Sequence, residues 1–459
     1  MNSQSKKMEL LGSTSIPKAL LAMGIPTMIG MLVNAFYNLV DAYFVGGLGE
    51  SQMGAISVVY PLGQVVVGLG LLFGNGAASY ISRLLGRGDK ENADKVASTA
   101  LYSSVSVGAV IIIISMVFLH PILNLLGATD SILPYAATYA GIYIVSCIFN
   151  VFNVTMNNIV TSEGAAKTTM CALLTGAVLN IALDPLFIYV FDLGVAGAAI
   201  ATAISQVVST CVYLTYIFRK KSVFHFRVKD CTYTKETMSE IFKIGIPTLV
   251  FQILTSVSIS LINNAAGDYG DSAIAGMGVV TRLISMGSLS VFGFIKGFQP
   301  IAGYSYGAKK FDRLREAIKT SILWSTVFCV IFGVILALFP TAIVSRFTKG
   351  DAEMIRIGAA SLRANGISIM LFGFYTVYSS LFLALGKGRE GFILGACRQG
   401  ICFIPVILLL PIVWGLNGIM YAQPIADVLS AVITVFMAIP LHKKLNEMQR
   451  KTAEISPNN

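Results

Sequence analysis

The sequence predicts an all-α integral membrane protein in which twelve transmembrane helices form two pseudo-symmetric six-helix bundles. The first observation is composition: 55% of the 459 residues are hydrophobic and 12% are charged, whereas charged residues make up about 25% of a typical soluble domain. The second is the recurrence of apolar stretches long enough to cross a bilayer core of about 30 Å. The third is an internal repeat, which divides these stretches into two equal sets.

The repeat is carried by identical residues at a fixed separation. The stretch Gly24–Thr27 (GIPT) recurs as Gly245–Thr248, a shift of 221 residues. The same shift relates Gly49 to Gly270, Ser51 to Ser272, Gly86 to Gly307, Gly194 to Gly415 and Gly197 to Gly418. A register held over this length indicates two tandem halves, an arrangement typical of secondary transporters.

We expect six spans in each half, bounded by the ends of the apolar runs. In the first half they cover 16–45, 53–80, 93–119, 133–160, 168–190 and 195–218. In the second half they cover 241–266, 273–302, 316–342, 355–384, 391–411 and 416–440. The chain then divides into a first bundle (1–218), a cytoplasmic linker (219–240), a second bundle (241–441) and a tail (442–459).

Basic residues predict the orientation of the helices. Most of the 33 Lys and Arg residues lie in the N-terminal segment, in alternate loops and in the tail. This bias marks cytoplasmic loops, so we expect a multi-pass protein of the cell membrane, in contact with the lipid bilayer, with both termini in the cytoplasm. The net charge of +10 follows from this topology, and we expect no nucleic-acid partner.

The sequence contains no motif for enzymatic or cofactor chemistry in the structural context that such a motif requires. GKGREG at 386–391 matches a dinucleotide-binding pattern, but it follows a membrane span rather than a strand. No Walker A motif occurs, the three histidines lie at helix ends or in loops, and the seven cysteines form no CxxC pair. We therefore expect neither an enzyme nor a cofactor.

Two carboxylates lie inside predicted spans of the first half. Asp41 follows Asn38 at helical spacing, and Asp184 lies one turn after Asn180. Ionisable groups are costly in a bilayer, so each of them invites a functional explanation. At about 1.5 Å per residue, both carboxylates and Thr202 of the sixth span fall at comparable depths.

These oxygen-bearing side chains predict a site for a coupling ion. A carboxyl pair can carry H⁺, and Asp41, Asn180, Asp184 and Thr202 together could hold Na⁺. The repeat acts as a control, because Ile262 stands where the second half would have its counterpart of Asp41. The alternative is a polar clamp that only holds helices together.

The second half carries its own intramembrane charges. Asp427 is expected to pair with Arg282 or Arg398 as a structural bridge, or to contact a cationic substrate in a central cavity. Lys296 is expected to extend its long side chain to the cytoplasmic surface. Arg363 lies in the tenth span.

Two prolines occupy matching positions, Pro26 in the first span and Pro247 in the seventh. Proline removes a backbone hydrogen bond and kinks a helix. A static kink in both halves is one interpretation. The other is that Pro26 is a hinge that bends during transport.

Taken together, these features resemble the MATE (multidrug and toxic compound extrusion) family, in its DinF-like branch. The resemblance covers nearly the whole chain. It is carried by IPTMIGMLVNAFYNLVDAYFVGGLG in the first span, by SRLLGRGDKENA after the second, and by LNIALDPLFIY followed by GVAGAAIATAIS. It implies two six-helix bundles that form a V around a central cavity, and export coupled to the entry of H⁺ or Na⁺.

The resemblance also implies roles for individual residues. The acidic residues of the seventh and tenth spans in the NorM-like branch have no counterpart here, so coupling is expected in the first bundle. The implied cation site there consists of Asp41, Asn180, Asp184, Thr202 and the Ala198 carbonyl, with Asn157 as an accessory.

The function predicted is a cation-coupled antiporter, acting as a monomer, that exports amphipathic, often cationic, organic compounds or drugs by alternating access. Its cavity should be roomy, apolar and lightly acidic. The alternative is a flippase for lipid-linked precursors, in which Arg282, Arg363 and Arg398 would make the cavity cationic, and a channel is a third class. The candidate cavity residues are Met31, Asn34, Tyr37, Asn38, Asn153, Met156, Arg282 and Asp427.

Overall fold

The computed structural model describes residues 3–348 and 350–455, and all regular structure within those ranges is helical. Within the same ranges, twelve helices are long and apolar enough to cross a membrane. Large apolar side chains are exposed along their outer faces, for example Ile331 and Leu338 of the ninth span, as expected of helices that contact lipid. The prediction of an all-α membrane protein with twelve spans is confirmed.

The first bundle follows a short N-terminal helix, α1 (Ser3–Gly12). Its spans closely match the predicted ranges, although several helices run further than the apolar stretches. The elements are α2 (Ile16–Gly46), α3 (Glu50–Gly86), α4 (Lys90–Val117), α5 (Leu119–Leu125), α6 (Leu133–Ser162), α7 (Ala166–Pro185), the π-helix η1 (Leu186–Val190) and α8 (Gly194–Phe218).

The second bundle follows a connection that contains one short 3₁₀ helix, η2 (Val228–Asp230). Two of its spans are interrupted, the tenth by η4 and the eleventh by the π-helix η5. The elements are α9 (Lys235–Gly267), α10 (Asp271–Gly307), α11 (Phe311–Leu338), α12 (Pro340–Val344), η3 (Ser345–Phe347), α13 (Ala352–Ser368), η4 (Ile369–Leu371), α14 (Phe372–Ala384), α15 (Gly388–Ala396), η5 (Cys397–Ile401), α16 (Phe403–Trp414) and α17 (Leu416–Ile455).

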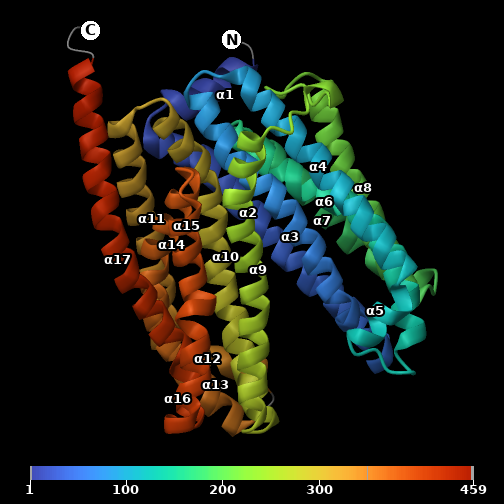
Figure 1. The fold of residues 1–459 in the computed structure, drawn as a ribbon. Helices are drawn as coiled ribbons and strands as arrows, with labels where there is room; N and C mark the ends of the chain where they lie inside the picture. Colours follow the sequence, from blue (N-terminus) through green and yellow to red (C-terminus); the bar gives the residue numbers. More distant parts are fainter. Residues whose placement is uncertain (1–2, 349, 456–459) are drawn as a thin grey trace.

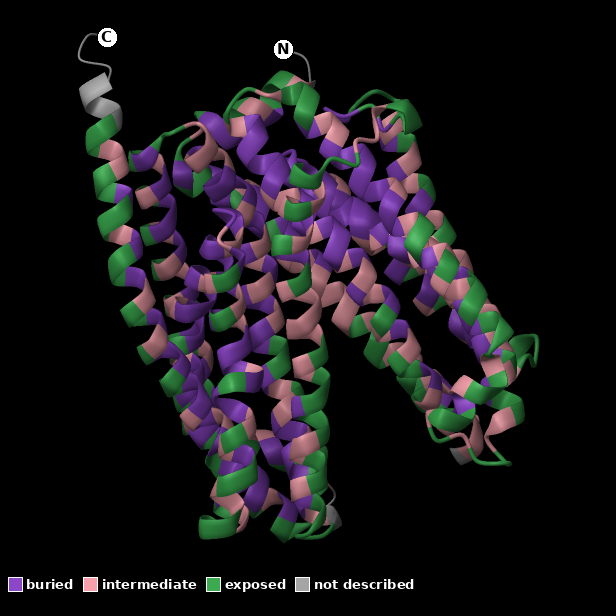
Figure 2. Ribbon diagram, viewed as in Figure 1, coloured by how far each residue is buried: buried purple, intermediate pink, exposed green. Residues whose placement is uncertain are grey.

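The two bundles form a V (Figure 1), which meets at the end that carries both termini and diverges at the other. Buried residues are concentrated where the bundles meet (Figure 2). The contacts there follow the repeat: α2 packs on α10, and α9, the counterpart of α2, packs on α3, the counterpart of α10. The bundles are therefore related by pseudo-twofold symmetry.

Glycines allow these helices to touch through their backbones. A Cβ on Gly297 of α10 would lie 2.5 Å from the backbone nitrogen of Gly24 in α2. A Cβ on its repeat counterpart, Gly76 of α3, would lie 2.3 Å from the carbonyl oxygen of Ile241 in α9. No side chain fits in either place, and such small-residue contacts are the usual basis of tight helix packing in lipid.

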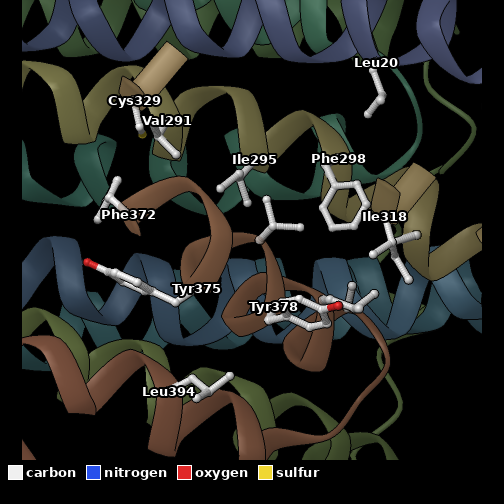
Figure 3. Close-up of a cluster of buried hydrophobic side chains, with 14 of the residues drawn as sticks. Leu20, Val291, Ile295, Phe298, Ile318, Cys329, Phe372, Tyr375, Tyr378 and Leu394 are labelled. Atoms are coloured by element: carbon white, nitrogen blue, oxygen red, sulfur yellow. The ribbon is translucent and has the colours of Figure 1, made fainter. Parts of the chain in front are cut away.

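The core of the second bundle also includes part of the first. Figure 3 shows Phe298 of α10 beside Ile318 of α11, with Phe372 and Tyr378 of α14 in the same cluster. Leu20 of α2 belongs to this cluster and is fully buried. The apex of the V is thus a shared core rather than a loose contact between two domains.

Polar contacts reinforce the apex. Arg83 of α3 forms an ion pair with Glu240 of α9 at 2.6 Å. Helix α1 is held on one side by the Lys7–Glu163 ion pair at 3.1 Å, at the end of α6. On the other side, Lys310, between α10 and α11, donates a hydrogen bond to the carbonyl of Gly12 at 2.8 Å. Helix α1 therefore contacts both bundles.

Aspartates begin two of the spans. The side chain of Asp89 accepts a hydrogen bond from the backbone N–H of Asn92 and caps α4, and Asp351 caps α13 in the same way. The side-chain amide of Asn92 also donates to Asp89, at 2.7 Å, and this hydrogen bond, together with the backbone one, holds the pKa of the Asp89 carboxyl below its ordinary value. Both caps lie in connections between spans, where water can reach them.

Candidate ion and substrate sites

Three helices of the first bundle bring polar side chains together at one place. Asn180 of α7 donates to Asp184 Oδ1, one turn further along the helix, at 3.3 Å. The same amide donates to Thr202 Oγ1 of α8 at 3.4 Å. Asn180 and Asp184 are 1% and 0% exposed, so these two side chains are removed from solvent, whereas Thr202 is half-buried. The helical spacing of the sequence is what places them on one face.

Asp41 of α2 completes this cluster. Its carboxyl and that of Asp184 are near enough to interact, and Tyr37 lies close to both. Three buried oxygens have no hydrogen-bond donor among the described residues: Asp41 Oδ1, Asn180 Oδ1 and Asp184 Oδ2. A buried acceptor left unsatisfied costs about 1–3 kcal/mol. The arrangement is therefore suited to a proton or a small cation that these oxygens would share.

The two remaining predicted members lie differently. Ala198 is buried on α8, one turn before Thr202, so its carbonyl belongs to the same helix face. Asn157 of α6 is occupied elsewhere: its Nδ2 donates to the Tyr213 hydroxyl at 3.3 Å, and its Oδ1 accepts from Lys296. The structure brings four of the six residues together, adds the helix face of Ala198, and places Asn157 at the contact between the bundles.

A cavity of about 510 Å³ lies largely within the second bundle. Its volume is within the range of about 300–1,000 Å³ that is usual for small-molecule sites. Most of the wall is contributed by α9, α10 and α14, and Met31, Leu71, Asn75 and Asn158 from the first bundle close one side. Apolar side chains such as Phe251, Phe292 and Ile295 alternate with amides and hydroxyls such as Gln252, Gln299 and Ser288.

The charge of this cavity differs from the prediction. The charged side chains among its lining residues are Lys296 and Arg398, and no acidic residue of the described chain lines it. The expectation of a lightly acidic cavity is wrong. The error arises because Asp427, which would supply the negative charge, lies behind the wall.

Asp427 of α17 is the centre of a buried polar network. Arg398 Nε lies 3.0 Å from Asp427 Oδ1, and Gln423 donates to the same oxygen at 2.9 Å. Ser368 donates to Oδ2 at 2.9 Å, and the Arg398 guanidinium covers the ring of Phe372. Of the two expected partners, Asp427 thus takes Arg398, while the side chain of Arg282 is exposed.

Lys296 was expected at the cytoplasmic surface, and this expectation is wrong. It lines the cavity and donates a hydrogen bond across the bundle contact to Asn157 Oδ1. The long side chain is directed by the face of α10 on which it lies, and that face meets α6 rather than the lipid. Depth along the helix does not reveal this.

The other cavity candidates are distributed as follows. Met31 lines the cavity. Asn153 ties α6 to α8, donating to Gln206 Oε1 at 2.8 Å and accepting from Thr210 at 2.9 Å, and Met156 is fully buried in the first bundle. Asn34, Tyr37, Asn38, Arg282 and Asp427 are absent from the lining.

Sequence reasoning missed the polar stripes that form the cavity wall. On α10, Thr281, Ser285 and Ser288 recur at helical spacing, and the stripe continues through Lys296 and Gln299. On α9 a similar stripe is formed by Thr248, Gln252 and Thr255. Periodicity of uncharged polar residues in the second half would have found both, but attention to ionisable groups alone did not.

Comparisons with known proteins agree over most of the chain. The family model for MatE matches residues 26–186 and 247–409, once in each half. The chain is 32% identical over 429 residues to the multidrug export protein MepA of Staphylococcus aureus (strain MSSA476), covering 93% of this chain and 94% of that protein.

Solved structures agree with the sequence comparison. A crystal structure of a MATE protein in complex with MaL6 superimposes with a TM-score of 0.91 at 26% identity, covering 97% of this chain and 99% of the other. A structure described as the outward-facing conformation of a multidrug resistance MATE family transporter of the MOP superfamily gives 0.90 at 26% identity, with the same coverage.

Proposed function

Because the chain belongs to the MatE family, we propose that this multidrug efflux transporter works as an antiporter driven by H⁺ or Na⁺. It exports amphipathic, often cationic, organic compounds by alternating access, as a monomer of the DinF-like branch. It is a multi-pass membrane protein and not an enzyme. MepA is named as a multidrug export protein, and the central cavity provides a suitable place for compounds of that kind.

The observation that carries the coupling proposal is the group of unsatisfied oxygens in the first bundle. Asp41, Asn180 and Asp184 present buried acceptors without donors, and two carboxyls face one another. Such a pair binds a proton, or Na⁺ with Thr202 and the Ala198 carbonyl as further ligands. Residues that served only as an interhelical clamp would be expected to satisfy their hydrogen bonds.

The V shape supports the proposal of alternating access. We place both termini in the cytoplasm on the basis of the Lys and Arg distribution, so the V of Figure 1 opens toward the outside. Pro26 interrupts the hydrogen bonding of α2 close to its contact with α10, and we propose that α2 bends there during transport. The three arginines expected of the flippase alternative do not supply a free cationic site, because Arg282 and Arg363 are exposed and Arg398 is paired with Asp427.

Dye efflux from proteoliposomes tests the proposal directly. Vesicles loaded with a cationic dye are exposed to an imposed pH gradient, to a Na⁺ gradient, or to neither. We expect efflux to require one of the two gradients and to stop when an ionophore collapses it. Equal dye movement with and without a gradient would identify a channel or an uncoupled carrier instead.

A further inference from the structure

The central cavity contains a positive charge without a counter-charge. Arg398 is neutralised by Asp427 at 3.0 Å, but Lys296 forms no ion pair with any described residue. The hydrogen bond that Lys296 donates goes to Asn157 Oδ1, a neutral amide oxygen. The net charge of the lining is therefore positive and comes from one side chain.

Lys296 lies where two different environments meet. On one side is the cavity of about 510 Å³ with the apolar walls of Phe251 and Phe292. On the other is a narrow polar pocket of about 10 Å³, about the space that one water requires. Lys296 lines both spaces, as do Asn158 and Gln299. An amphipathic molecule in the cavity would thus meet a charged donor and amides at one end, and aromatic side chains along its body.

Electrostatics then decides which head group is favoured. The ammonium of Lys296 is half-buried and has no counter-charge, an arrangement that is less favourable than one in which a carboxylate or phosphate pairs with it. A ligand with an acidic group supplies that partner and gains a charge-assisted hydrogen bond. A ligand whose only charge is positive adds a second cation to a cavity that has no acidic wall, and like charges repel at short range.

We propose that the central cavity selects amphipathic compounds that carry an acidic group, a carboxylate or a phosphate, and that Lys296 binds this group. The inference rests on the proposed export function and narrows its substrate class: zwitterions and organic acids bind here in preference to permanent cations. This inference does not change the proposed coupling site in the first bundle, because Asp41 and Asp184 lie outside the cavity lining.

The test uses two probes that differ in one group: a rhodamine with a free benzoic acid, and the methyl ester of the same dye. Fluorescence polarisation measures their binding to the full-length protein in detergent. We expect wild type to bind the acid more tightly than the ester. The Lys296→Gln variant should weaken acid binding by about tenfold or more, the usual scale of a hydrogen bond to a charged group, whereas Lys296→Arg should retain the preference.

A matched control removes one positive charge elsewhere. Lys319 is exposed on α11 and absent from the cavity lining, so Lys319→Gln should leave both dissociation constants unchanged. The inference is overturned if acid and ester bind wild type equally, or if Lys296→Gln does not alter their ratio. Gradient-driven efflux of the ester by wild type keeps the two proposals separate: if it occurs while the acid has no advantage, only the role of Lys296 fails.

The acidic group could belong to a soluble compound or to a lipid, and we assign it to a soluble compound. The acid titration is therefore repeated in nanodiscs of zwitterionic lipid alone and of a mixture with anionic lipid. We expect similar affinities in both. Anionic lipid could instead abolish binding of the acid both to wild type and to Lys296→Arg. That result would show that the site binds a lipid head group, and the assignment to a soluble compound would be wrong.

Discussion

Gly86 of α3 and Gly307 of α10 each lie against the backbone of the other's helix. A Cβ on Gly86 would lie 2.1 Å from the carbonyl oxygen of Tyr304, and a Cβ on Gly307 would lie 2.1 Å from that of Arg83. The two glycines are counterparts in the repeat, and Tyr304 and Arg83 are each one turn before the glycine of their own helix. The pseudo-twofold axis therefore passes through this crossing.

This crossing predicts that alanine is poorly tolerated at either position. Gly307→Ala should lower the free energy of unfolding by about 1–3 kcal/mol, the usual cost of overpacking, measured as a lower midpoint of thermal unfolding in detergent. Gly278→Ala is the control, because no atom lies within 4 Å of its Cβ position, and there alanine should be neutral or stabilising. Equal midpoints for the two variants would show that the helices separate readily at the apex.

The coupling cluster predicts loss of gradient-driven transport without loss of folding. Asp41→Asn and Asp184→Asn keep the shape of each side chain but cannot alternate between charged and neutral forms. Each should abolish dye efflux driven by a pH or Na⁺ gradient, while size-exclusion profiles stay unchanged. Asp130→Asn, in an exposed loop, should transport normally. Near-normal efflux by either cluster variant would remove that carboxylate from the mechanism.

Antiport predicts that substrate and coupling ion oppose each other. Each ligand stabilises a conformation that the other disfavours, so their binding free energies are linked reciprocally. The affinity for dye in detergent should fall as H⁺ or Na⁺ is raised, and the effect should disappear in Asp184→Asn. An affinity independent of both ions would contradict coupling altogether.

The Arg398–Asp427 pair predicts a stability effect that is separable from coupling. Asp427→Asn leaves a buried guanidinium without its counter-ion, which costs about 3–5 kcal/mol, so thermal unfolding should occur at a clearly lower temperature. The double variant Arg398→Met, Asp427→Leu removes both charges and should recover much of the loss. Substrate-driven uptake of H⁺ or Na⁺ by folded Asp427→Asn should persist. If uptake disappeared there and survived in Asp41→Asn, coupling would belong to the second bundle.

The sequence predicted the number of spans and their order, because hydropathy and the repeat report directly on the membrane and on the two halves. It underestimated the helix ends. Helix α9 begins at Lys235 rather than near 241, and α17 continues to Ile455 rather than ending near 440. Helical hydrogen bonds continue into water when charged residues replace apolar ones, whereas hydropathy follows only the segment inside lipid. Hydropathy over the length of a span did not detect the short helices α5 and α12.

The candidate ion site could be predicted from the sequence, whereas the position of Lys296 in the cavity could not. Asp184 and Asn180 are neighbours on one helix, and their burial follows from the cost of charge in a bilayer. The position of Lys296 depends on which face of α10 meets α6 across the bundle contact. That is a relation between distant parts of the chain, and neither spacing nor depth contains it.

Helix α1 has a mechanical consequence. Lys7 holds it to Glu163 in the first bundle, while Lys310 and Arg313 of the second hold the carbonyls of Gly12 and Leu11. Any motion that separates the bundles at the apex must break the contacts of α1 with one bundle or the other. Hydrogen bonds to charged groups contribute about 1.5–3 kcal/mol each, so α1 adds to the free energy needed to separate the bundles at the apex. The ten residues of α1 lie outside the spans and therefore help to set how often the molecule opens at the end of the V that carries both termini.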